Sequence, residues 1–109
     1  MIIKKRVLDK LFNSDLIKKV YPMIDKIDCG VNWDGDEEFP NYEIYLDIYL
    51  NDPSITEKNM YRKEFDPHYL VDMYLIKLMK MAGIDMKEIE NFIIKVYNSD
   101  GEIIYPSES

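Results

Sequence analysis

Residues 27–33 and 42–50 alternate almost strictly between apolar and polar or small side chains. Because successive side chains of a strand point to opposite faces of a sheet, this period of two is typical of half-buried strands. The connecting residues include the turn-forming pair Asp34 and Gly35. The pattern therefore predicts an antiparallel hairpin with a long, acidic loop.

Apolar side chains recur at helical spacing near the N-terminus, first over residues 3–11 and again over residues 16–24. Residues 13–15 interrupt the pattern with good N-cap chemistry, and Pro22 disfavours helix at the residue before it. This region predicts two short helices or one kinked helix.

The clearest helix signal starts at Asp66, a capping residue, followed by Pro67 at the first helical position. An apolar face continues until Gly83, which ends the helix. Residues 85–88 then resemble a capping box that opens a brief helical turn.

Three further segments favour strands. The mixed pattern of residues 60–65 suggests a third strand, and residues 92–97 and 102–105 flank a turn at 98–101 that is typical of a hairpin. The order is helix, two or three strands, helix, two strands. We therefore expect an α+β fold with two main helices on an antiparallel sheet of four to five strands.

Composition agrees with a single domain over residues 1–105, followed by a frayed tail at 106–109. Apolar residues make up 47% of the chain, which is enough for one core. With one cysteine, no signal peptide and no long apolar run, we expect a soluble protein in the cytoplasm or associated with a virion, without contact to a membrane. A composition rich in Lys, Ile, Asn, Asp and Tyr resembles that of small proteins from AT-rich bacterial or phage genomes.

Charge is strongly polarised along the chain. Residues 27–57 hold nine Asp or Glu and no Lys or Arg, whereas the first 26 residues hold seven Lys or Arg against three Asp. The net charge of -7 argues against direct binding to nucleic acid and favours a basic partner.

The acidic loop superficially matches a calcium-binding loop, because Asn32, Asp34, Asp36 and Glu43 fall at positions one, three, five and twelve. The match fails at position six, where Glu37 replaces the required glycine. We therefore expect a solvated hairpin tip and assign no metal or cofactor.

Tyr45 and Tyr49 share a strand face with Glu43 and Asp47, opposite the apolar stripe of the same strand. We expect this face to point outward as a contact surface, since exposed tyrosines are good binding anchors. The alternative is cross-strand packing under another element. Trp33, beside the acidic turn, is either a second anchor or a lid on the core, and we favour the lid.

The acidic loop residues Asp34, Asp36, Glu37 and Glu38 allow a second hypothesis, in which carboxylates imitate nucleic-acid phosphates and occupy a basic groove. The alternative is a solvated face.

No catalytic motif accompanies these features. His68 has Asp72 one helical turn away but no nucleophile, and Cys29 falls on the inward face of its strand. The sequence thus favours a non-enzymatic interaction or assembly module that makes contacts through the outward Tyr45/Tyr49 face or through a sheet edge. Its partner is a second copy, joined through that edge, or a basic protein. An acidic nucleic-acid mimic is the alternative, and a small enzyme or metal-binding domain comes third.

Overall fold

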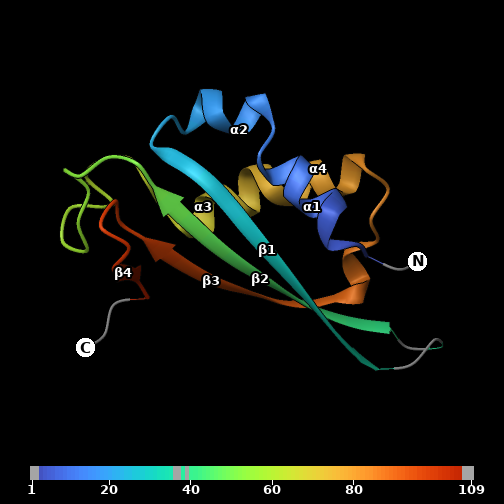
Figure 1. Cartoon of the computed structure of the whole chain (residues 1–109). Helices are drawn as coiled ribbons and strands as arrows, with labels where there is room; N and C mark the ends of the chain where they lie inside the picture. The colour runs from blue at the N-terminus through green and yellow to red at the C-terminus, as the bar shows by residue number, and fades with distance from the viewer. Residues whose placement is uncertain (1–2, 36–37, 39, 107–109) are drawn as a thin grey trace.

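Helices cover one face of a mixed sheet (Figure 1). The computed structural model describes residues 3–35, 38 and 40–106, and within them the sheet has four strands in the order β1-β2-β3-β4. The helical elements are α1 (Lys5–Phe12), α2 (Asp15–Val20), α3 (Pro67–Leu70), the π-helix η1 (Val71–Leu75), α4 (Ile76–Met81) and the 3-10 helix η2 (Met86–Glu88). The strands are β1 (Ile24–Gly35), β2 (Pro40–Leu50), β3 (Ile89–Tyr97) and β4 (Ile103–Tyr105).

The α+β prediction is confirmed, but the expectation of a purely antiparallel sheet is wrong. β1 and β2 form the predicted hairpin, and β3 and β4 form the second one. β2 and β3, however, run parallel to each other. A parallel pair needs a long crossover, which the helical segment from α3 to α4 supplies.

The predicted third strand at residues 60–65 is also wrong, because this segment forms turns. The Lys63 amide donates to the Asn59 carbonyl at 3.0 Å, and the Phe65 amide donates to the Met60 carbonyl at 3.1 Å. Met60 and Phe65 are nevertheless buried, together with Ile55. The apolar residues of this loop therefore anchor it to the core without forming a strand.

The N-terminal region forms two short helices, as predicted. Ser14 occupies the N-cap position of α2, although its hydroxyl makes no capping bond and has no partner among the described residues. The neighbouring Asn13 instead bonds across to β1.

The crossover helix begins and ends where the sequence indicates. The Asp66 carboxylate accepts hydrogen bonds from the backbone amides of His68 and Tyr69, at 2.9 and 3.4 Å. Gly83 follows α4 with a φ of 84°, a left-handed conformation that suits glycine at a helix end. The π-helical turn between α3 and α4 was not predicted, whereas the brief turn at residues 85–88 is confirmed as η2.

A single hydrophobic core lies between the helices and the inner face of the sheet. The apolar stripe of β2, formed by Ile44, Leu46 and Ile48, is completely buried at the centre of this layer. None of the helices among the described residues combines the length and apolar character that crossing a membrane requires. Of the expected tail, only Pro106 lies within the described residues.

Candidate interaction surface

The sheet face opposite the helices carries no helix in the part of the chain that the structure describes (Figure 1). We call it the outer face. Register partners on adjacent strands share a face, so the outer side chains form rows across the sheet. These rows are Lys26 with Tyr49 and Tyr97; Asp28 with Asp47 and Lys95; Gly30 with Tyr45 and Ile93; and Asn32 with Glu43 and Asn91.

The first row is aromatic. The rings of Tyr49 and Tyr97 stack with centroids 4.7 Å apart and planes 9° from parallel, and the Lys26 ammonium lies 5.0 Å from the Tyr49 centroid. Burial and the nearby Asp47 carboxylate raise the pKa of Tyr49, so this phenol stays neutral over the physiological range. Ile103 of β4, which is 49% exposed, pairs with Tyr97 at the end of the row.

The second row places two like charges side by side. Asp28 and Asp47 are direct register partners on adjacent antiparallel strands. Like charges in this position oppose folding, so this pair does not stabilise the sheet. The Lys26 Nζ lies 3.7 Å from Asp28 Oδ2, and Lys95 of β3 is the register partner of Asp47.

The third row centres on Tyr45, which is 39% exposed. A Cβ atom at Gly30 would lie 3.3 Å from the Tyr45 Cβ and 3.8 Å from its ring. Gly30 therefore leaves room for the Tyr45 ring to lie against the β1 backbone. Tyr45 is thus a supported aromatic side chain with an accessible surface.

The structure brings together four of the predicted surface residues, namely Glu43, Tyr45, Asp47 and Tyr49, and places all of them on the outer face. Trp33 is different. Its alternation with the buried Cys29 puts it on the inner side of the sheet, where it remains 52% exposed. Its register partner there is the buried Tyr42, so Trp33 lies on the opposite side of the sheet from Tyr45 and Tyr49 and does not join the outer face. Its role as a lid on the core stays a prediction.

The predicted acidic loop is described only in part. Glu38 is exposed, whereas Asp36 and Glu37 lie outside the described residues. Asp34 belongs to β1 through its backbone, and its side chain is outside the described part.

Sequence reasoning missed the outer-face residues of the neighbouring strands, among them Asp28, Gly30, Ile93 and Tyr97. The period-two pattern of the C-terminal strand does place Ile93 and Tyr97 on one face. It contains no signal that this strand lies beside β2 and parallel to it. A hairpin register drawn from residues 27–50 could have found Asp28 and Gly30.

The two residues considered for chemistry have structural surroundings. Cys29 is buried, and its burial together with the neighbouring Asp9 carboxylate raises the pKa of its thiol. His68 hydrogen-bonds through Nε2 to the hydroxyl of Tyr105, in place of the contact with Asp72 that helical spacing suggested. Within the described ranges, no three His, Cys, Asp or Glu side chains are placed to hold a metal ion.

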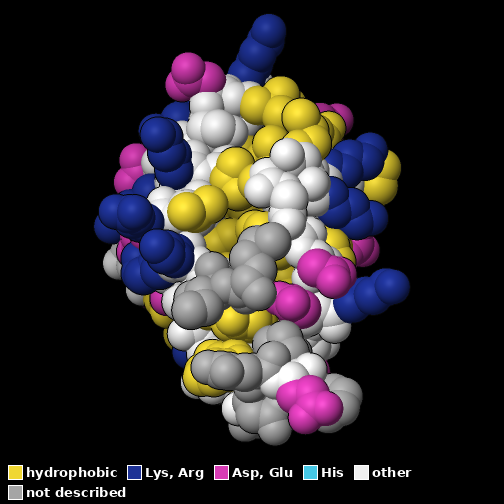
Figure 2. Space-filling view, turned by 90° about the vertical axis from the view of Figure 1, so that its right-hand side faces the viewer, with side chains coloured by type: hydrophobic (Ala, Val, Ile, Leu, Met, Phe, Trp, Pro, Cys, Tyr) yellow, Lys and Arg dark blue, Asp and Glu magenta, His cyan; other side chains and the backbone are white. Residues whose placement is uncertain are grey.

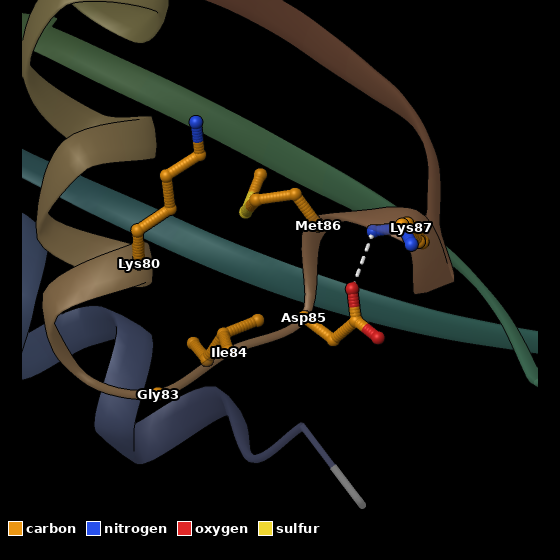
Figure 3. A pocket seen from close by; sticks show the side chains of 6 residues that line it. All are labelled: Lys80, Gly83, Ile84, Asp85, Met86 and Lys87. Carbon is orange, nitrogen blue, oxygen red and sulfur yellow. Dashed lines mark hydrogen bonds between the residues drawn. The ribbon is translucent and has the colours of Figure 1, made fainter.

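A surface hollow of about 460 Å³ lies after α4 (Figure 3). The Asp85 carboxylate in this hollow already accepts a hydrogen bond from the Lys87 backbone amide at 3.0 Å. The Lys80 ammonium points away from that carboxylate (Figure 3). No nucleophile and acid–base pair converge among its lining residues, which are Lys80, Gly83, Ile84, Asp85, Met86 and Lys87. The outer face remains the strongest candidate site.

Comparison with known proteins adds no relative from which a function could be transferred. No protein-family model, no curated protein and no solved structure matches the chain.

Proposed function

We propose that this protein is a non-enzymatic interaction module whose outer face binds a basic segment of another protein. The observation that carries this proposal is a sheet face that no described helix covers, on which the Tyr45 ring lies in the row next to the facing carboxylates of Asp28 and Asp47. Exposed aromatic rings supply binding area, and carboxylates at their rim select for Lys and Arg.

The charge distribution supports a basic partner. The sequence from Asp28 to Asp47 contains seven acidic residues and no Lys or Arg. Lys26 and Lys95 flank Asp28 and Asp47. A partner cation between the two carboxylates would reduce their mutual repulsion further, and an Arg could also stack on the Tyr45 ring. Such binding should weaken as salt concentration rises.

A non-enzymatic role agrees with the state of the reactive side chains. The thiol of Cys29 is inaccessible and its pKa is raised, so it is a poor nucleophile. The His68 ring is engaged with Tyr105, and no carboxylate among the described residues hydrogen-bonds to that ring.

Tyr45→Ala should weaken binding of a basic peptide by at least about tenfold, because aromatic hot-spot anchors contribute about 2 kcal/mol or more. We suggest calorimetry with a blocked hexapeptide that alternates lysine and valine. The free energy of unfolding of Tyr45→Ala should differ from that of the wild type by only about 1 kcal/mol, since Tyr45 is part-exposed and contributes mainly cross-strand contacts. The matched control is Tyr61→Ala, which removes a 58% exposed tyrosine outside the sheet and should leave affinity unchanged.

The second candidate is an acidic mimic of nucleic acid, favoured by the facing carboxylates on the hairpin. In that case charge alone would govern recognition. Replacing Asp28 and Asp47 with asparagine would then abolish binding, while Tyr45→Ala would not affect it. That combination would contradict the aromatic surface and support the mimic.

A further inference from the structure

The outer edge of β1 is blocked over part of its length by side chains of the α1 region. Asn13 behaves like a neighbouring strand: its Oδ1 accepts from the Ile27 amide and its Nδ2 donates to the Ile27 carbonyl, both at 2.8 Å. The Cys29 amide donates to Asp9 Oδ1 at 3.0 Å. The N-terminal region therefore protects this stretch of the edge from pairing with another chain.

The protection ends after Cys29. In an antiparallel ladder, outward-pointing main-chain groups recur at every second residue, so Val31, Trp33 and Gly35 point outward like Ile27 and Cys29. Among the described residues, no group from outside the sheet hydrogen-bonds to the backbone of Val31 or Trp33. In Figure 1 this end of the hairpin extends beyond α1. We call residues 31–35 the open edge.

The two sides of the open edge differ in chemistry. On the inner side lie Val31, which is part-buried, and the half-exposed Trp33. On the outer side lie Asn32 and its partner Glu43, joined by a 3.3 Å hydrogen bond, in the row beyond Tyr45. A strand added here would place alternate side chains against an apolar surface and an acidic one.

The two edges of the sheet differ in the charged side chains beside them. Figure 2 looks onto this end of the molecule, where Lys and Arg lie on both flanks and Asp and Glu lie between them and down to the lower end. The opposite edge, along β3, also pairs with no described strand from Ile89 to Lys95. Its outer face carries Lys95, whereas Asn32 on the outer face of the open edge is uncharged and lies beside Glu43.

We propose that the basic partner adds an extended segment to the open edge as a fifth strand, with apolar side chains towards Val31 and Trp33 and Lys or Arg towards Asn32 and Glu43. Main-chain hydrogen bonds would provide affinity, and the alternating side chains would provide specificity. The basic character of the segment rests on the proposed function. A second copy is disfavoured as the occupant because pairing two β1 edges would bring two acidic hairpin ends together.

The test compares two blocked hexapeptides of equal charge, one alternating lysine and valine and the other alternating lysine and proline. Proline lacks the amide that a strand ladder needs, so only the lysine–valine peptide can form a strand on the edge. We expect it to bind at least about tenfold more tightly. In amide NMR spectra of the wild-type protein, the amides of Val31 and Trp33 should shift and become protected from hydrogen exchange.

Val31→Pro should abolish this preference, because it removes an outward amide that makes no bond to β2. Val31→Ala is the control, since it keeps the amide while shortening the same side chain. If Val31→Pro does not fold, the amide shifts and hydrogen-exchange protection of Val31 and Trp33 in the wild-type protein test the edge pairing instead.

Each of the other outcomes is informative. Equal binding of both peptides, with shifts at Tyr45 but not at Val31, would overturn edge pairing and leave the proposed function standing. If neither peptide binds up to its solubility limit, both the edge pairing and the proposed function would be overturned. A wild-type dimer that Val31→Pro converts to monomer would show that a second copy occupies the edge.

Discussion

Replacing Phe65 with alanine should lower the free energy of unfolding by about 3–5 kcal/mol, the usual range for a buried phenylalanine. Phe65 is fully buried, and its ring makes an edge-to-face contact with Tyr21 at a centroid distance of 6.0 Å. It closes the loop between β2 and α3, so the cavity would separate this loop from the core. The melting temperature should fall by well over about 10 °C.

Tyr61→Ala serves as the control for Phe65→Ala. Tyr61 belongs to the same loop but is 58% exposed, so its removal should change stability by no more than about 0.5 kcal/mol. Similar losses for the two variants in chemical denaturation would contradict the assignment of Phe65 as the anchor of this loop.

Asn13→Ala should lower the free energy of unfolding by about 2–3 kcal/mol, since the change leaves several part-buried polar groups without partners. The Asn13 side chain makes the two bonds to Ile27 and donates a third, at 2.7 Å, to the Asp9 carbonyl. Its loss would also extend the open edge towards Ile27. We therefore expect concentration-dependent association in light scattering, in addition to the lower stability.

Ser14→Ala is the matched control for this prediction. The Ser14 hydroxyl has no hydrogen-bond partner among the described residues, so alanine should be tolerated or slightly stabilising. A loss of stability equal to that of Asn13→Ala would show that side-chain bonding to the β1 edge contributes little.

The elements that the sequence predicted well are those with a strong period. The hairpin of β1 and β2 and the crossover helix from Asp66 to Gly83 both emerge from local patterns. In each case the side chains that face the core are close in sequence, so alternation or helical spacing reports burial directly. The outward direction of Tyr45 and Tyr49 follows from the same alternation.

The features that the sequence did not predict depend on distant contacts. Residues 60–65 contain apolar side chains because the loop packs on the core, and this resembles a strand pattern locally. The parallel pairing of β3 with β2 depends on where the crossover helix returns the chain. The sequence indicates a helix-capping role for Asn13, yet its side-chain amide hydrogen-bonds to the backbone of Ile27, fourteen residues away.

The candidate surface divides in the same way. The predicted group on β2 is intact because one strand supplies all of it. Tyr97 and Ile93 join it only through the parallel register of β3, and Trp33 is separated from it because its strand position puts it on the inner side. A stretch of sequence can indicate which face a side chain occupies, but the neighbours on that face depend on the pairing of strands.

The most direct test of the outer face is to follow the tyrosine ring resonances by NMR while the lysine–valine hexapeptide is added at low salt. The proposal predicts the largest shifts at Tyr45, smaller ones at the stacked pair Tyr49 and Tyr97, and none at Tyr61 or Tyr69. These last two are 58% and 52% exposed and provide internal controls outside the sheet. Shifts confined to Tyr61 and Tyr69, or unchanged rings at saturating peptide, would contradict the assignment of the outer face as the interaction surface.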